Sequence, residues 1–273
     1  MRTARSTRFA RGLRTARTAR GPRTARPLAV LAAAVLLALG TGAPAAGTVR
    51  GVGTADAPLP ERMADTGGGS QLLTAEAPDA GSTTGRLTWW DRRDGRWVAA
   101  GSAAARFGAG GLTEGAGRRQ GTSTTPTGVY ALPYAFGTAP APAGTAYSYR
   151  PVTVASWWCQ DNASRDYNRW VEGLPADCRA AESERLADYG TQYSHAMVIG
   201  FNYHRPVRGR GAGIFLHVDG AGATAGCVSV PADAMRAVLA WADPVRAPHL
   251  AIGTADGPTA LTAVTRFGGT TKD

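Results

Sequence analysis

The sequence predicts a mainly β domain with one helix docked on it near the C-terminal end. Two β-prone runs, 87–90 and 96–100, flank Asp94-Gly95, a dipeptide typical of tight hairpin turns. One segment, 231–242, carries an apolar stripe at helical spacing. Short apolar runs that read as buried strands recur at 195–201, 213–217 and 249–253.

The first 46 residues predict an export signal. Arginine stands at every third position from Arg2 to Arg26, with no acidic residue among them. The stretch 28–39 is apolar throughout, and Ala43-Pro44-Ala45 offers the small residues that signal peptidase accepts. Because a membrane-spanning helix needs roughly 20 apolar residues, we expect a signal peptide over 1–46, with an uncleaved anchor as the alternative. After cleavage no stable membrane span is expected, and the protein would be secreted.

The basic character of the chain belongs to that leader. The chain has 30 Lys and Arg against 20 Asp and Glu, a formal net charge of +10. Nine of the basic residues lie in 1–26, which leaves 21 basic and 20 acidic residues in the remainder. A nearly neutral mature chain lacks the basic surface that nucleic acids require, so no nucleic-acid partner is expected.

Composition divides the rest of the chain into three parts. Residues 47–84 are rich in Gly, Ala, Thr, Ser and Pro without sustained periodicity, which predicts a flexible linker. A folded domain is predicted over 85–254, a length that supports one sizeable core, and 255–273 is expected to form a mobile tail. We expect the protein to be a monomer.

The elements of that domain are predicted in chain order. The hairpin around Asp94-Gly95 comes first, and a Gly-rich irregular stretch precedes further strands at 127–132 and 149–154. The polar segment 157–192 holds at most a short helix near 182–189. In the helix 231–242, Pro231 suits the first turn, and Asp243-Pro244 ends it.

The residues that carry chemistry are a histidine and a cysteine near the C-terminal end. His217 ends an apolar strand, and Cys227 follows ten residues later, after a Gly-rich turn. A loop of nine residues is short enough to bring both to one end of adjacent strands. A thiol within reach of an imidazole is the minimal apparatus for acyl transfer through a thioester. The structural alternatives are a buried cysteine and a hydrogen-bonded core histidine.

Two other cysteines predict a disulfide. Cys159 and Cys178 lie 19 positions apart in a chain expected to be exported, and their pairing leaves Cys227 reduced. A metal site is the alternative, but no His or Cys pair has zinc-ligand spacing, so neither a metal nor a cofactor is expected. His195, His204 and His249 are interpreted as structural or surface residues. The paired tryptophans, at 89–90 and 157–158, either fill the core or line a glycan groove.

Three segments resemble the catalytic domain of L,D-transpeptidases of the YkuD type, most closely its secreted actinobacterial members. They are Thr125-Pro126-Thr127-Gly128-Val129-Tyr130, Ile214-Phe215-Leu216-His217 and Thr224-Ala225-Gly226-Cys227-Val228. The resemblance covers approximately 85–254, with the motifs in the family's order. It implies a β-sandwich-like catalytic fold and a cysteine nucleophile that attacks peptidoglycan stem peptides.

By that resemblance, Cys227 takes the acyl group of the donor peptide's third residue and releases the terminal D-alanine. An amine of a neighbouring stem would then form a 3→3 cross-link, whereas water would give L,D-carboxypeptidase activity. His217 would carry the proton, oriented by a backbone carbonyl between Val218 and Gly220.

The loop before the nucleophile would bind the substrate. The N–H groups of Gly226 and Cys227 are the expected oxyanion donors, and Thr224 and Ser229 are the expected neighbours of the substrate. This chain departs from the family pattern, because Ala225 replaces a second histidine and Ser229 replaces Arg or Asn. The thiol, the imidazole and the oxyanion donors are nevertheless all available.

Three alternatives stay open beside this interpretation. A catalytically silent wall-binding module is suggested by Ala225 and the tryptophans. A papain-like peptidoglycan cysteine hydrolase has its nucleophile before its histidine, so His249 would be its base in place of His217. The third is an exported structural domain without a substrate.

Overall fold

A computed structural model describes residues 57–262 of the chain. The predicted signal peptide and residues 263–273 lie outside the described residues. The helices are α1 (Leu59–Arg62) and α2 (Ala232–Trp241), with 3-10 turns η1 (Gly115–Gly117), η2 (Ala180–Glu182), η3 (Leu186–Tyr189) and η4 (Pro244–Arg246). The first seven strands are β1 (Gln71–Ala77), β2 (Thr84–Arg93), β3 (Arg96–Arg106), β4 (Leu112–Glu114), β5 (Thr125–Ala131), β6 (Ala135–Gly137) and β7 (Tyr149–Pro151). The others are β8 (Ser156–Cys159), β9 (Arg169–Glu172), β10 (Ser183–Arg185), β11 (Ala196–Val198), β12 (Phe215–Val218), β13 (Val228–Val230) and β14 (His249–Thr254).

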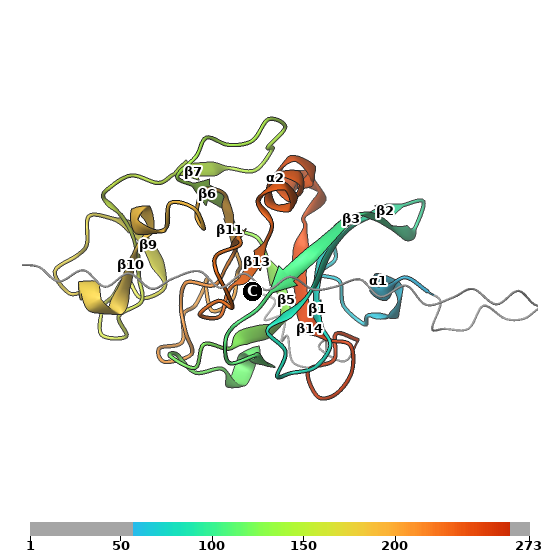
Figure 1. The fold of residues 1–273 in the computed structure, drawn as a ribbon, viewed down its shortest axis with the longest axis horizontal. Coiled ribbons are helices and arrows are strands. Elements are labelled where there is room, and N and C mark those ends of the chain that lie inside the picture. The colour runs from blue at the N-terminus through green and yellow to red at the C-terminus, as the bar shows by residue number, and fades with distance from the viewer. Residues whose placement is uncertain (1–56, 263–273) are drawn as a thin grey trace, which may run out of the picture. The chain divides into compact units, whose positions relative to one another are not determined.

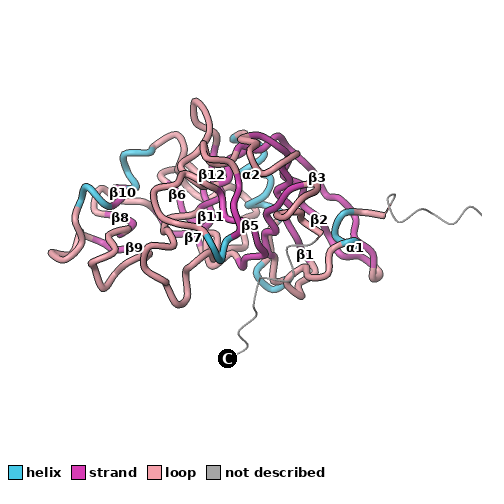
Figure 2. Tube along the Cα trace, turned by 90° about the horizontal axis from the view of Figure 1, so that it is seen from below, coloured by secondary structure: helices cyan, strands magenta, loops and turns pink. Residues whose placement is uncertain are grey.

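These strands form two sheets, which confirms the predicted mainly β fold class. In the described part of the chain, eleven strands hydrogen-bond in the order β4-β5-β14-β1-β2-β3-β13-β12-β11-β6-β7, and β10-β8-β9 form a smaller sheet. The small sheet and the β1–β2–β3 ladder lie at opposite ends in both views (Figures 1 and 2). Within 57–262, no helix has the length and apolar character needed to cross a membrane.

The hairpin predicted around Asp94-Gly95 joins the two longest strands. Asp94 has φ of 50° and Gly95 has φ of 79°, and two successive positive φ values are what a type I′ turn requires. The pairing of β2 with β3 then runs from Arg93 opposite Arg96 back to Thr84 opposite Arg106. The turn chemistry therefore sets the register from Arg93 to Trp90, beyond which an irregularity between Trp89 and Trp90 shifts it.

The predicted linker 47–84 extends too far, because β1 lies inside it. This strand pairs parallel with β14 and antiparallel with β2, and Leu72 and Leu73 are fully buried. A strand buried on both faces shows no alternation of apolar and polar residues. The composition of this segment alone therefore predicted a linker where the structure has a strand. The predicted tail is also wrong over its first part, since Ala260 and Leu261 are buried and Leu261 N–H donates to Thr254 O at 2.7 Å.

The segment predicted to hold a short helix near 182–189 contains two 3-10 turns instead. Between η2 and η3 the chain forms β10, whose Ser183 pairs with Cys159 of β8. Pairing with β8 extends the backbone at this point, so a continuous helix cannot form.

The predicted C-terminal helix is α2, and its apolar stripe covers one face of the large sheet. Met235, Val238 and Leu239 are fully buried. Pro231 is the N-cap residue of this helix, one position before the first turn in which it was expected. Above the sheet, α2 sits over the region of β13 (Figure 1).

The two faces of the β12–β13 pair bury different clusters. One face packs with α2 in the main core and comprises Leu216, Val218, Val228 and Val230. The other face carries Phe215 and Cys227, which pack with aromatic residues of the small sheet, Trp158 and Trp170. The candidate nucleophile therefore lies between the large sheet and the small one.

Candidate active site

Cys227 stands immediately before β13, at the end of the Gly-rich loop. Its side chain is buried, with 7% of its surface exposed, and it is the free cysteine of the described chain. The sulfur accepts a hydrogen bond from Phe215 N–H and donates to Gly213 O, each at 3.4 Å. In this state the thiol faces the backbone that leads into β12.

Two hydroxyl groups fix the backbone of Cys227. Thr224 Oγ1 donates to Cys227 O at 2.7 Å, and Thr125 Oγ1 donates to the same oxygen at 3.2 Å. Thr125 also accepts from Gly108 N–H at 2.8 Å. The Thr-Pro segment and the cysteine loop, about a hundred residues apart in sequence, are thus joined at the nucleophile's own carbonyl group.

His217 lies in β12 and is held by its own strand. Its Nδ1 atom is 2.8 Å from Val218 O. Because a carbonyl oxygen accepts hydrogen bonds, Nδ1 carries the proton, and the lone pair of the neutral ring is on Nε2. The ring also packs edge-on against Tyr193, with centroids 5.4 Å apart. Within the described residues, the ring of His217 hydrogen-bonds to Val218 O, and no hydrogen bond joins this ring to Gly220.

His217 and Cys227 share one face of the parallel β12–β13 pair. His217 pairs with Ser229, so Cys227 is displaced by two residues and is a diagonal neighbour of His217. Because residues two positions apart along a strand point to the same side, both side chains lie on one face of the sheet. Among the described residues no hydrogen bond joins the imidazole to the thiol. The expectation that both lie at one end of adjacent strands is therefore corrected: the strands run parallel, and His217 lies near the end of β12 while Cys227 precedes the start of β13.

A cavity of about 340 Å³ opens beside Cys227, between the loop 118–123 and the small sheet. This volume is in the range of small-molecule sites. Its lining comprises Arg118, Gln120, Gly121, Ser123, Gln160, Ala181, Glu182, Ser183, Glu184, Ala212, Gly213, Ala225 and Cys227. His217 is not part of that lining, whereas Ala225, the replacement for the family's second histidine, is.

Burial keeps both candidate catalytic groups uncharged. Burial first, and then the negative charge of Glu184, raises the pKa of the Cys227 thiol to about 12, although Phe215 N–H and Arg118 oppose this. Burial also lowers the pKa of His217, against the opposing effects of Val218 O and Asp219. At neutral pH the pair therefore consists of a thiol and a neutral imidazole, not of a thiolate and an imidazolium.

The other predicted loop residues have local partners. Gly226 N–H donates to Thr224 Oγ1 at 3.1 Å, so this expected oxyanion donor is already occupied. Ser229 was expected beside the substrate, but its side chain is fully buried and its hydroxyl donates to Asp219 Oδ1 at 2.7 Å. Ser229 therefore anchors the turn after β12, and it is not among the residues that line the cavity.

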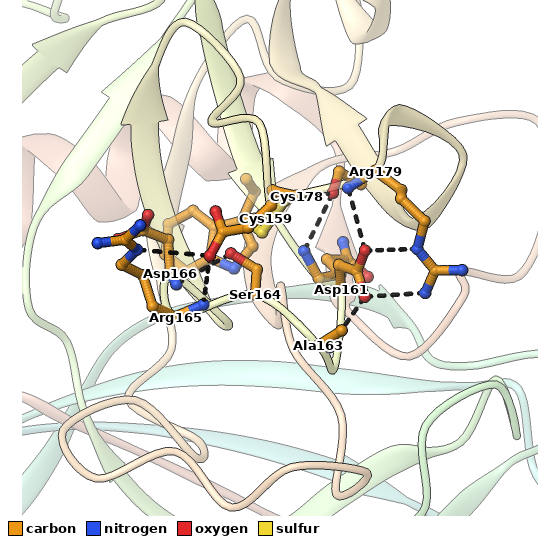
Figure 3. Close-up of a disulfide and its surroundings, with 12 residues drawn as sticks. Cys159, Asp161, Ala163, Ser164, Arg165, Asp166, Cys178 and Arg179 are labelled. Atoms are coloured by element: carbon orange, nitrogen blue, oxygen red, sulfur yellow. Dashed lines mark hydrogen bonds and ion pairs between the residues drawn. A yellow bond between two sulfur atoms is a disulfide. The ribbon is translucent and has the colours of Figure 1, made fainter.

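The predicted disulfide between Cys159 and Cys178 is present (Figure 3), and Cys159 directly precedes a residue of the cavity lining. Gln160, the next residue after Cys159, lines the cavity. Beside the disulfide, the fully buried Asp161 accepts from Arg179 Nε at 2.6 Å and from Ala163 N–H at 2.9 Å. The Arg179 and Ala163 hydrogen bonds lower the pKa of Asp161, so this loop stays pinned by an ionised carboxylate.

The remaining histidines and tryptophans have structural surroundings. His249 lies at the start of β14, its Nδ1 atom 2.9 Å from Ala247 O, and it is absent from the cavity lining. The papain-like alternative, which needs His249 beside Cys227, therefore has no support from the geometry. Trp158 is 1% exposed, so it fills the core instead of lining a glycan groove.

Three charged residues of the cavity were not found from the sequence. Arg118 lies in the Gly-rich irregular stretch 107–124, and Glu182 and Glu184 lie in the polar segment 157–192. Neither segment has a periodic pattern that would single out one charge, so the sequence offers no local signal for these residues.

The chain is similar to known proteins at the level of a sequence family and of a solved structure. A family model described as the L,D-transpeptidase catalytic domain, YkuD, matches residues 81–255. Among solved structures, the chain is similar to Bd1075 of Bdellovibrio bacteriovorus, at 12% identity and a TM-score of 0.35. That likeness covers 67% of this chain and 48% of Bd1075, so it spans about half the length of that protein. No curated protein sequence matches the chain.

Proposed function

Because the chain belongs to the YkuD family of L,D-transpeptidase catalytic domains, we propose that it is an exported cysteine acyltransferase acting on peptidoglycan stem peptides. Cys227 is the nucleophile and His217 is the base. The observation that carries this proposal is the position of the free thiol: it lines a ligand-sized cavity, on the strand face that it shares with His217.

In the first step the thiol leaves Gly213 O and attacks the carbonyl carbon of the donor's third residue. His217 Nε2 takes the thiol proton as the C–S bond forms, which suits a pair that is neutral at rest. The resulting oxyanion is stabilised by the N–H group of Cys227. The imidazolium then gives its proton to the amine of the departing D-alanine as the C–N bond breaks, and a thioester remains.

In the second step a nucleophile resolves the thioester. An amine of a neighbouring stem gives a 3→3 cross-link, whereas water gives a shortened stem and carboxypeptidase activity. His217 removes the proton of this nucleophile, and the C–S bond breaks to restore the thiol. No hydrogen bond joins the imidazole to the thiol in the described residues, which agrees with catalytic contacts that tighten only when substrate binds.

The surroundings of the site support an extracytoplasmic location. A disulfide persists in oxidising compartments, and Cys159 of the Cys159–Cys178 disulfide directly precedes Gln160, which lines the cavity. We propose that the signal over 1–46 directs export and that the mature protein acts at the cell wall.

The test is turnover of disaccharide–tetrapeptide units by the wild-type protein, Cys227→Ala and His217→Ala, followed by chromatography and mass spectrometry. We expect D-alanine release by the wild type, none from Cys227→Ala, and a loss of at least about 10²-fold from His217→Ala, the range of a general base. His204→Ala, an exposed histidine, is the matched control and keeps its rate.

Undiminished release by Cys227→Ala would contradict the proposal. Retention of the wild type on sacculi without any release would instead favour the silent wall-binding module.

A further inference from the structure

Arg118 is a buried cation in the wall of the cavity that Cys227 lines. Only 6% of its surface is exposed. Its Nε atom donates to Thr124 O at 2.7 Å and its Nη1 atom donates to Arg210 O at 3.1 Å. Both partners are uncharged backbone carbonyls, and within the described residues no carboxylate forms an ion pair with this guanidinium.

A buried charge is costly unless it is paired, so the missing counter-ion requires a reason. The ionisable groups whose charges act most on Arg118 are Cys227, Tyr167 and Tyr130, a thiol and two phenols. Burial lowers the pKa of the guanidinium, but arginine remains charged at physiological pH. The ring of Phe201, 5.6 Å from Arg118 Cζ, offers a cation–π contact, but no anionic group within 57–262 pairs with this charge beside the candidate nucleophile.

Two glycines bring this guanidinium up to the nucleophile's loop. Gly226, with φ of 133°, directly precedes Cys227, and a Cβ atom there would lie 2.7 Å from Arg118 Nη2. A Cβ atom at Gly211, with φ of 118°, would overlap Arg118 Nη1. The backbone therefore makes room for the guanidinium on both sides, and Nη2 ends one residue from Cys227.

The guanidinium nitrogen that makes no hydrogen bond, Nη2, is available to the cavity. Nη2 has no hydrogen-bond partner within 57–262, and it is not among the fully buried unpartnered atoms of that range, so solvent reaches it. On another part of the lining, Glu184 accepts from Tyr193 Oη at 2.8 Å. The lining also includes Glu182, and burial raises the pKa of Glu184, so Arg118 is the one residue of this lining that attracts an anionic group.

From this geometry we infer that Arg118 binds a carboxylate of the substrate, the terminal carboxylate of the residue that leaves when Cys227 attacks. The inference rests on the proposed function for the identity of that substrate. It makes the cavity selective for peptides that end one residue after the attacked carbonyl group.

The first experiment measures kcat/KM for a tetrapeptide stem with a free terminal carboxylate and for its terminal carboxamide. Hydrogen bonds to charged groups predict that the wild type prefers the carboxylate by about 10- to 100-fold. In Arg118→Met this ratio falls to near one, mainly through KM, and Arg118→Lys keeps part of it because Lys lacks the forked geometry. Arg119→Met, an exposed neighbour, keeps the wild-type ratio.

A purely structural role for Arg118 would lower both rates equally and leave the ratio intact, which would overturn the inference. Circular dichroism and thermal unfolding of each variant identify those that do not fold. If Arg118→Met does not fold, the comparison is carried by Arg118→Lys and by the wild-type ratio. A wild type that turns over both peptides equally would refute the inference and leave the proposed function standing.

The second experiment needs no peptidoglycan and separates the two proposals. Cys227 is alkylated with iodoacetate or with neutral iodoacetamide at one pH; in both, the thiolate forms a C–S bond and iodide leaves. The thiolate fraction cancels in the ratio of the two rates. For the wild type we expect this ratio to exceed that of glutathione by about tenfold, as for one charge-assisted hydrogen bond, and to fall to the glutathione value in Arg118→Met.

An iodoacetate preference that depends on Arg118, in a protein that turns over no stem peptide, would support the anion site and refute the proposed function. If Arg118→Met slows both reagents by the same factor, Arg118 acts on the thiol alone, and the carboxylate inference is wrong.

Discussion

The Cys159–Cys178 disulfide gives the most quantitative prediction for stability. The perturbation is the double variant Cys159→Ser, Cys178→Ser, which opens a loop closed over 19 residues. In the chain-entropy model, closing a loop of that size stabilises the folded state by about 3 kcal/mol. For a domain of 150–250 residues each kcal/mol shifts the melting temperature by about 2–4 °C, so the variant should melt about 6–12 °C lower.

The effect on stability arises in the unfolded chain, because the folded loop keeps its other ties. Asp161 still accepts from Arg179 Nε at 2.6 Å, and Ser183 still pairs with Cys159's position in the β8–β10 ladder. The folded structure should therefore survive, with a native circular dichroism spectrum. The neighbouring position Gln160 lines the cavity, so we also expect a raised KM for the peptide substrate.

The assay is thermal unfolding of the wild type and the double variant, each with and without reductant. Reductant should lower the wild-type melting temperature to that of the variant and leave the variant unchanged. A variant that melts within about 2 °C of the wild type, less than 1 kcal/mol in effect, would refute the reasoning, because the loop would then be constrained equally well without its covalent link.

Three further predictions test the site and the core. Alkylation of Cys227 by iodoacetamide should still accelerate above pH 9, since burial raises the pKa of the thiol to about 12; a rate that levels off below pH 8 would contradict this assignment. Met235→Ala, on the buried face of α2, should lower the free energy of unfolding by about 2–5 kcal/mol in urea titration; the exposed Arg236→Ala is its control, and equal effects would disprove the packing. Ser229→Ala should lower the free energy of unfolding by about 1 kcal/mol, because the hydrogen bond to Asp219 is lost, and should leave KM unchanged. A raised KM would indicate that Ser229 contacts the substrate after all.

The sequence reveals the elements whose signals are local. The hairpin is encoded by Asp94-Gly95, because a turn with two positive φ values accepts few other pairs. The helix α2 is encoded by its apolar stripe. The disulfide is predicted because two of the three cysteines can pair and leave the third reduced. Each of these signals depends on residues close together in the chain or on simple counting.

The elements that were missed depend on distant partners. Strand β1 lies between β14 and β2 and has polar Thr74 and Gln71 buried among apolar residues, so its composition resembles a linker. The diagonal placement of His217 and Cys227 follows from a parallel pairing, which a short loop would not lead one to expect. The role proposed for Arg118 depends on its close approach to Gly211 and Gly226, which lie about a hundred residues away in the sequence.

The central claim is that Cys227 forms an acyl-enzyme. A carbapenem tests it directly, because attack on the lactam carbonyl breaks the ring C–N bond and leaves the whole molecule attached to sulfur. Intact-protein mass spectrometry should show one added carbapenem mass on the wild type and none on Cys227→Ala. An adduct on both proteins, or on neither, would contradict the claim.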